Sequence, residues 1–275
     1  MKVFFIGTSA CIPGKGEETA SFLINEHILV DTGWCNVLKM KEYGFAPEKL
    51  NYLILTHLHQ DHYIGLPQLL FYLGMRKADG IHSPQRPLTV IGPSEKLEYI
   101  LKKTEEFLQV ERFQELTLKL QPYVLVPGKT YEDNDIRLET IPGKHISGAD
   151  QPEKTLVCKL TDKHSYGTVC FTGDTSYHPP IADFAKGVPA LIHDSCHTSA
   201  ADAAAIAKSA GVDRLFLIHH PVSANAEKLR EAQAVFPASF LAEAGKSIEI
   251  WESVKQAVFG GKGRGARPHP QLLVG

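Results

Sequence analysis

Several features that would assign this sequence to familiar protein classes are missing from it. No apolar run approaches the roughly 20 residues that a membrane-spanning helix needs. Residues 1–7 are too short and too soon interrupted to be a signal peptide. The five cysteines are widely spaced and include no Cys-x-x-Cys pair, which argues against a disulfide framework and against a thiolate zinc site. These absences predict a cytoplasmic protein with reduced thiols.

An excess of positive charge is also missing. The net charge is −2 at pH 7 and the sequence pI is about 6.7, so no overall positive field attracts nucleic acid or an anionic membrane. We expect no membrane partner, and nucleic acid is not favoured because a local patch would have to bind it. The 275 residues, 43% of them hydrophobic, are enough for one large core. We predict a single domain over residues 1–259 and a Gly/Pro-rich basic tail over residues 260–275.

Strand-like and helix-like segments alternate along the chain without an internal repeat, which favours an α/β (α+β) fold. A helical pattern runs through Leu69 and Leu73, another begins near Ser94, and an alanine-rich helix is capped by Ser199 and closed by Gly211. A homodimer through the Ser94 helix or the basic tail stays open. The predicted strands cover residues 2–6, 21–25, 27–31, 50–56, 136–141, 155–160, 168–172 and 214–218.

Histidine is abundant, with 13 residues, and the histidines are not scattered. His57, His59, Asp61 and His62 leave the end of the predicted strand 50–56 within six positions. Alternate residues leaving a strand share a side, so His57 and His59 can chelate one metal ion. The turn that follows can direct Asp61 and His62 at a second ion. Imidazole and carboxylate together suit zinc, with manganese or iron as alternatives.

Three further candidate ligands follow predicted strands: His145, Asp174 and His219. Seven ligands for two divalent metal ions, with Asp174 as the shared bridge, leave open positions for a water and a substrate oxygen. Open positions distinguish a catalytic site from a closed structural one. His193 and His220 stand beside stronger candidates, and whether they line the pocket stays open.

The His-x-His-x-Asp-His run, together with the later His145, Asp174 and His219, resembles the five-motif signature of the metallo-β-lactamase-fold hydrolases. Residues 6–13, 53–67 and 87–93 are similar to the ribonuclease Z branch, as is the segment from His197 to His219. The resemblance implies a four-layer αββα metallo-β-lactamase sandwich.

The sequence also departs from ribonuclease Z. Residues 31–35 replace a glutamate-containing turn, and Ser176-Tyr177 replaces an Arg-Pro pair. The tRNA-gripping arm of that branch lies between the third-motif histidine and the bridging aspartate, and here the span from His145 to Asp174 is short. The departures favour a phosphodiesterase-like relative without the arm.

The resemblance implies a binuclear metal-dependent hydrolase, a phosphodiesterase with a metal-bridging hydroxide as nucleophile. Its expected substrate is a small-molecule or short phosphodiester. Asp61 would orient the attack, and His197 would protonate the leaving alkoxide. Thr172 and Thr175 flank Asp174 and are expected to donate hydrogen bonds that fix it. Three alternatives stay open: a ribonuclease Z-like tRNA 3′-processing endonuclease, a thioester or lactone hydrolase, and a non-catalytic metal-binding sensor or assembly protein.

Overall fold

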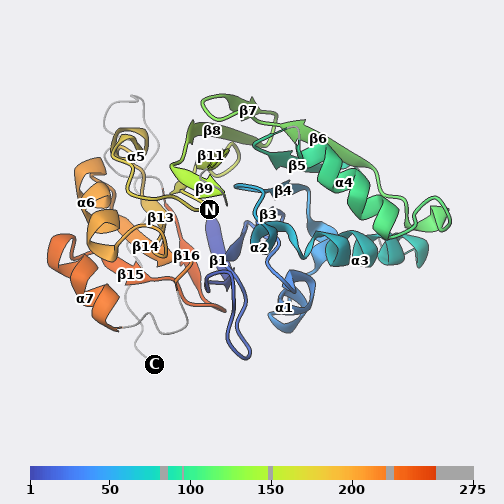
Figure 1. The fold of residues 1–275 in the computed structure, drawn as a ribbon, viewed down its shortest axis with the longest axis horizontal. Helices are drawn as coiled ribbons and strands as arrows, with labels where there is room; N and C mark the ends of the chain where they lie inside the picture. Colours follow the sequence, from blue (N-terminus) through green and yellow to red (C-terminus); the bar gives the residue numbers. More distant parts are fainter. Residues whose placement is uncertain (81–85, 95, 148–150, 221–225, 252–275) are drawn as a thin grey trace, which may run out of the picture.

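The computed structural model describes residues 1–251 except 81–85, 95, 148–150 and 221–225. Within these residues two seven-stranded sheets face each other, and helices cover the outer face of each sheet (Figure 1). The four layers confirm the predicted αββα sandwich. No helix in the described part of the chain is long and apolar enough to cross a lipid bilayer.

The first sheet has the strand order β16-β1-β2-β3-β4-β5-β6 and is parallel from β3 to β6. Its strands are β1 (Lys2–Gly7), β2 (Ser21–Ile24), β3 (Ile28–Val30), β4 (Tyr52–Ile54), β5 (Leu88–Gly92), β6 (Leu120–Val124) and β16 (Ser247–Glu249). The helices on its side are α1 (Asn36–Glu42), α2 (Gln60–Tyr63), α3 (Leu66–Ala78) and α4 (Lys96–Phe107), with short 3₁₀ turns at Pro47–Lys49 and Gln114–Leu116.

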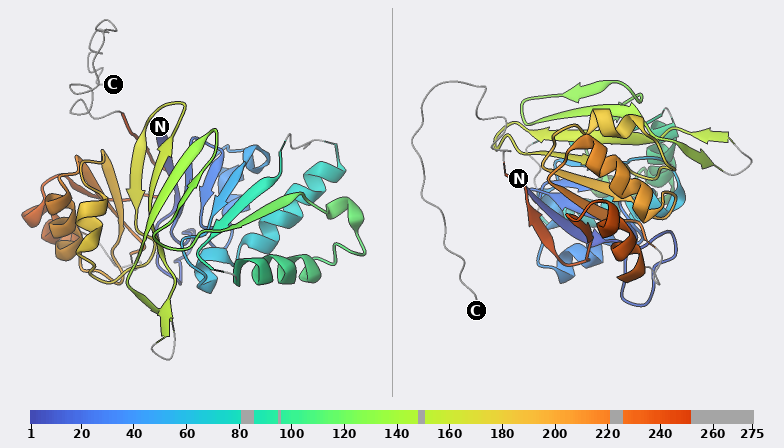
Figure 2. Two further views of the ribbon diagram at one scale, coloured as in Figure 1. Left: turned by 90° about the horizontal axis from the view of Figure 1, so that it is seen from above. Right: turned by 90° about the vertical axis from the view of Figure 1, so that its left-hand side faces the viewer.

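The second sheet has the order β15-β14-β13-β12-β11-β8-β7 and is parallel from β12 to β15. Its strands are β7 (Thr130–Glu132), β8 (Ile136–Pro142), β11 (Leu156–Asp162), β12 (Thr168–Phe171), β13 (Ala190–Asp194), β14 (Arg214–Ile218) and β15 (Ser239–Leu241). Helices α5 (Pro180–Phe184), α6 (Ala200–Ala210) and α7 (Ala226–Val235) cover its outer face (Figure 1). The hairpin β9 (His145–Ser147) and β10 (Gln151–Glu153) pairs only with itself and projects from the body (Figure 2).

Side-chain alternation along the strands builds the layers. Tyr52 and Ile54 of β4 enter the core between the sheets, whereas Leu53 and Leu55, the residue after the strand, pack under helices α1 and α3. All four are fully buried. Successive side chains of a strand point to opposite faces, so a continuous apolar run is expected where both faces of a sheet are covered. The buried run therefore indicates an inner strand of a covered sheet.

Several local predictions are confirmed. The predicted strands 21–25 and 27–31 are present as β2 and β3, and Asn25 and Glu26 in the tight turn between them both have positive φ (48° and 62°). Ser199 accepts a hydrogen bond from the Asp202 amide at the start of α6, and Gly211 ends this helix with φ of 66°. The basic tail, residues 260–275, lies outside the described residues. The single-domain division and a dimer through α4 stay predictions.

Candidate metal centre

The seven side chains predicted as metal ligands all lie at one edge of the sandwich, where parallel strands of both sheets end. Ligands commonly bind beyond the carboxyl ends of such strands. His57 and His59 follow β4, Asp61 and His62 lie on α2, His145 opens β9, Asp174 follows β12, and His219 follows β14.

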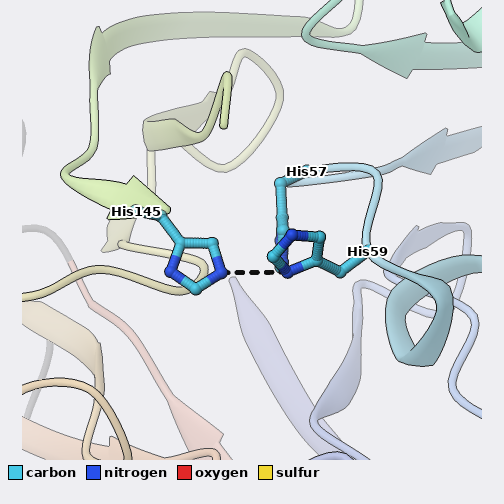
Figure 3. A group of neighbouring side chains, drawn as sticks. All are labelled: His57, His59 and His145. Atoms are coloured by element: carbon cyan, nitrogen blue, oxygen red, sulfur yellow. Dashed lines mark hydrogen bonds between the residues drawn. The ribbon is translucent and has the colours of Figure 1, made fainter. Parts of the chain in front are cut away.

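The first group of candidate ligands is a cluster of three histidines (Figure 3). His59 Nδ1 lies 3.0 Å from His145 Nε2. The ring centroid of His57 lies 4.7 Å from that of His59 and 5.1 Å from that of His145. One donor atom from each ring lies within 4.8 Å of the others, which is close enough for one ion to contact all three.

The second group contains Asp61, His62 and His219. Asp61 Oδ2 lies 3.4 Å from His62 Nε2 and 3.5 Å from His219 Nε2. A cation held here would be bound by one carboxylate and two imidazoles, a donor set that suits zinc and its first-row neighbours.

Asp174 lies between the two groups. Its Oδ1 is 3.4 Å from both His62 Nε2 and His219 Nδ1, and its Oδ2 is 3.7 Å from His57 Nε2 and 3.9 Å from His145 Nε2. Each carboxylate oxygen therefore faces a different group. This is the arrangement expected of a carboxylate that bridges two cations.

The ring nitrogens of the cluster fit a metal-binding role. In the described part of the chain, the Nε2 atoms of His57, His62 and His219 are buried and have no hydrogen-bond partner. Buried polar atoms are nearly always satisfied in proteins, and each unsatisfied one costs about 1–3 kcal/mol. Divalent cations in this position would satisfy all three nitrogens.

The backbone is constrained where it presents these ligands. His219 has φ of 57°, in the left-handed region that residues other than glycine rarely adopt. Gly173 has φ of 55°, and a Cβ atom built on it would lie 2.7 Å from the Thr56 Cβ. Only glycine therefore fits beside Asp174. Unfavourable backbone conformations tend to concentrate at functional sites.

Asp31 orients one of the candidate ligands, a role that sequence analysis did not assign. Its carboxylate accepts a 2.8 Å hydrogen bond from His62 Nδ1 and further bonds from the amide and hydroxyl of Thr56. The bond fixes the imidazole so that Nε2 is directed at Asp61 and Asp174. Asp31 follows β3, the parallel neighbour of β4, and this position is the sequence signal that could have identified it.

The protonation states of His57, His145 and Asp174 suit cation binding, because metal ligands must give up their protons. At His62 and His219 burial opposes protonation, but the surrounding carboxylates outweigh it and raise the pKa of these two imidazoles, so a cation would have to displace their protons. Burial lowers the pKa of His57 well below its ordinary value and lowers the pKa of His145 to about 4. Burial opposes ionisation of Asp174, but the neighbouring His62 and His219 outweigh it and hold the pKa of this carboxyl well below its usual range. Two imidazoles are thus neutral and the bridging carboxylate is charged.

The predicted role of Thr172 and Thr175 is wrong in detail. The Thr172 hydroxyl donates to the Gly173 carbonyl and accepts from the Asp194 amide. The Thr175 hydroxyl accepts from the Lys144 amide and donates to the Ser176 carbonyl. Both threonines therefore tie neighbouring segments to the Asp174 loop rather than donating to the carboxylate.

His197, the predicted proton donor, lies at the mouth of the cluster with its side chain 32% exposed. Its Nδ1 is 3.0 Å from Asp194 Oδ2 and 3.6 Å from Asp174 Oδ2, and its ring stacks on that of His219. Helix α6 has its N-cap at Ser199, so His197 is not a residue that starts the helix. Its position supports a role in catalysis.

Asp194 is the second functional side chain that sequence analysis missed. It is fully buried at the end of β13, where it bonds His197 and also accepts from the Cys196 amide at 2.9 Å. Its Oδ1 lies 3.2 Å from His219 Nδ1. Like Asp174, it is a carboxylate at the carboxyl end of a buried parallel strand, but that strand was not predicted.

Asp194→Asn should shift the pH dependence of hydrolysis. The hydrogen bond from His197 to Asp194 raises the pKa of this histidine. A proton donor must be protonated, so activity falls as the pH rises through that raised pKa. Removing the negative charge lowers the pKa, and the alkaline limb of the kcat profile should move to lower pH.

The profile is measured together with metal content, because Asp194 also contacts His219. The exposed Asp213, changed to Asn, provides the matched control. An alkaline limb that stays in place in a fully metal-loaded Asp194→Asn protein contradicts the assignment.

The two ambiguous histidines lie outside the cluster. His193 is buried in β13, and its Nδ1 donates to the Asp194 carbonyl at 2.7 Å. His220 lines a groove with Thr8 and Glu17 beside β15, and its ring approaches the Ala242 carbonyl. Neither is among the groups of described side chains that could share an ion.

Comparison with known proteins identifies the family. The family model described as Anti-Pycsar protein Apyc1 matches residues 1–209, which include six of the seven candidate ligands and stop short of His219. The chain belongs to this family. The match covers well over half of the sequence.

Curated relatives carry the name ribonuclease Z. Those of Methanothermobacter thermautotrophicus and Metallosphaera sedula are 25% and 28% identical, over 91% and 88% of this chain and 97% of each relative. Among solved structures, the metallo-β-lactamase fold protein YhfI from Bacillus subtilis matches with a TM-score of 0.72 and 25% identity, covering 90% of this chain and 98% of that protein.

Human tRNase Z, short form, matches with a TM-score of 0.71 and 19% identity, over 91% of this chain and 99% of that one. A diphosphatase of the PhnP family matches with a TM-score of 0.64 and 16% identity, over 90% and 97%. The protein is thus a metal-dependent hydrolase with a metallo-β-lactamase fold. Membership of that superfamily implies divalent metal ions.

Proposed function

We propose that the protein is a binuclear phosphodiesterase whose metals are held by His57, His59, Asp61, His62, His145, Asp174 and His219. The observation that carries the proposal is the position of Asp174, with one carboxylate oxygen near each of the two groups of ligands. Imidazole and carboxylate donors favour zinc, and manganese or iron fit the same set.

Each group has a separate task in this reaction. Divalent cations, when bound, supply Lewis acidity and lower the pKa of a water toward ~7. Asp61, the most exposed of the carboxylates at 15%, accepts a hydrogen bond from the attacking group and orients it. His197, held by Asp194, donates a proton to the leaving alkoxide.

The substrate class separates two candidates. The relatives named ribonuclease Z, which align along nearly their whole length, favour an RNA 3′-processing endonuclease. The absence of positive net charge and the short span from His145 to Asp174, whose described residues form the hairpin β9–β10 before β11, favour a small or short phosphodiester. Both candidates break a phosphodiester with the same residues, and of the two the comparisons support the RNA substrate more strongly.

One substrate panel tests both. The metal-loaded protein is given an aryl phosphodiester, linear and cyclic nucleotides, a short oligoribonucleotide, and a tRNA precursor with a 3′ trailer. We expect hydrolysis of phosphodiesters, and the ratio of kcat/KM between precursor and small substrates identifies the class. Efficient trailer cleavage would show that the argument from the missing arm is wrong.

Thioester and lactone probes complete the panel, because the same metal site can catalyse their hydrolysis. Hydrolysis of these probes without phosphodiester cleavage contradicts the proposal that the protein is a phosphodiesterase. Full metal loading without turnover of any probe favours a non-catalytic sensor or assembly role.

A further inference from the structure

A thiol lies at the mouth of the metal centre and takes no part in the proposed hydrolysis. Cys196 is exposed, and its Sγ lies within 4.8 Å of a ring nitrogen of His197 and of a ring nitrogen of His219. Of the candidate ligand groups in the described part of the chain, this is the one that contains sulfur.

The position of Cys196 is fixed by its backbone. The Cys196 amide donates to Asp194 Oδ1 at 2.9 Å, and the Ser195 amide and hydroxyl both donate to the Ile218 carbonyl at 2.9 and 3.0 Å. Ile218 directly precedes His219. The thiol and the imidazole are therefore presented by two parallel strands that are hydrogen-bonded at their ends, and their separation is set by the sheet.

The surroundings favour a cation. The carboxylate of Asp194 lies beneath His197 and His219, and the Asp174 carboxylate is within 3.6 Å of the His197 ring and 3.4 Å of the His219 ring. The His219 side chain is only 4% exposed, and its Nε2 has no hydrogen-bond partner among the described residues. Two carboxylates and an imidazole without a hydrogen-bond partner at Nε2 thus lie close to the exposed Cys196 thiol.

We propose that Cys196, His197 and His219 form a site for a soft divalent cation such as cadmium, and that occupation of this site stops hydrolysis. A thiolate with two imidazoles binds soft and borderline cations more tightly than imidazole and carboxylate alone. The cation displaces the thiol proton to solvent and leaves no other product. Zinc in excess is accepted by the same donors.

Inhibition follows from which residues the site shares. His197 is the proposed proton donor, and a bound cation occupies its ring. His219 is a proposed ligand of the second hydrolytic ion, and it cannot serve both ions equally well. The inhibition rests on the proposed hydrolytic function, whereas binding of the cation to the thiol does not.

The test is a cadmium titration of the zinc-loaded protein. Cadmium bound to a thiolate produces a charge-transfer absorption in the ultraviolet, and the proposed hydrolytic centre contains no sulfur. We expect one thiolate-bound cadmium per chain, with loss of alkyl phosphodiester hydrolysis, which needs the proton from His197, at the same cadmium concentration. Cys196→Ser should abolish the absorption and raise the half-inhibitory cadmium concentration at least about tenfold, with activity before cadmium unchanged.

Cys35→Ser is the matched control, because Cys35 is partly exposed and lies outside the candidate ligand groups of the described residues, whereas the exposed Cys11 acts electrostatically on the Cys196 thiol. It should retain both the absorption and the inhibition. If the cadmium–thiolate absorption survives in Cys196→Ser, Cys196 does not bind the cation and the proposed site is wrong. If cadmium inhibits both variants equally, binding at the site does not cause the inhibition of hydrolysis. Zinc content and activity before cadmium test the proposed function separately, since a protein that binds no zinc can still show the cadmium absorption.

Discussion

Replacing Asp174 by Asn is expected to remove most of the bound metal and nearly all hydrolysis. The amide has one carbonyl oxygen and no charge, so it cannot face both groups of ligands as the carboxylate does at 3.4 to 3.9 Å. Metal content should fall below one ion per chain, and kcat/KM should fall by at least about 1,000-fold, because the loss of even an outer hydrogen bond costs about 10–100-fold at metal sites.

Metal analysis and kinetics on the purified protein check this result. Asp213→Asn serves as the control, since it makes the same chemical change on an exposed loop. A folded Asp174→Asn protein that retains two ions and normal turnover contradicts the proposal that Asp174 bridges the two metal ions. Retention of one ion with residual activity shows instead that the two groups bind independently.

Replacing His197 by Ala is expected to lower kcat by about 100- to 10,000-fold while metal content stays near that of the unchanged protein. His197 is not among the seven proposed ligands, and its ring is held by Asp194 at the mouth of the centre. The loss should depend on the leaving group. A nitrophenolate leaves without a proton, whereas an alkoxide needs one, so the defect should be small with an aryl phosphodiester and large with an alkyl one.

The leaving-group comparison separates proton donation from a structural role. His164→Gln, a change at an exposed histidine that pairs with Asp135 rather than with a candidate ligand, provides the control. If His197→Ala lowers turnover of both phosphodiesters equally, or lowers metal content in proportion to activity, the residue is not the proton donor.

The candidate site could be located in the sequence because its proposed ligands leave strands, and strands are readable from apolar runs. His57 to His62 follow one continuous apolar segment, and Asp174 and His219 follow two others, so a short-range pattern locates each ligand. That all of them meet at one edge is a property of parallel strands. The distances between them come from the packing of two sheets, which no local pattern encodes.

What was missed depended on tertiary neighbours. Asp194 is the last residue of β13, whose mixed sequence Ile192-His193-Asp194 did not stand out from a loop. Asp31 is a single acidic residue whose role depends on His62, which is 31 positions away and becomes its neighbour only when β3 pairs with β4. Thr172 and Thr175 were placed correctly beside Asp174. The hydrogen-bond partner of a side-chain hydroxyl depends on differences in distance of fractions of an ångström, which the sequence does not show.

The hairpin β9–β10 shows a different limit. The span from His145 to Asp174 was predicted to hold two strands, and its described residues form four, because a short hairpin precedes β11. Its three-residue strands have no alternation of apolar and polar residues from which they could be predicted. The family resemblance predicted the ligands residue by residue, whereas the loops that select the substrate carry no comparable signal.

The candidate ligands come from both halves of the sandwich: His57, His59, Asp61 and His62 follow β4 of the first sheet, and His145, Asp174 and His219 follow β8, β12 and β14 of the second. Cations bound between them would cross-link the two sheets. Thermodynamic linkage then makes the unfolding free energy of the whole protein rise with free metal concentration, by about 2.7 kcal/mol per site at 100 times the dissociation constant. For such a protein the melting temperature becomes a measure of metal supply, and chelation weakens the fold as well as the chemistry.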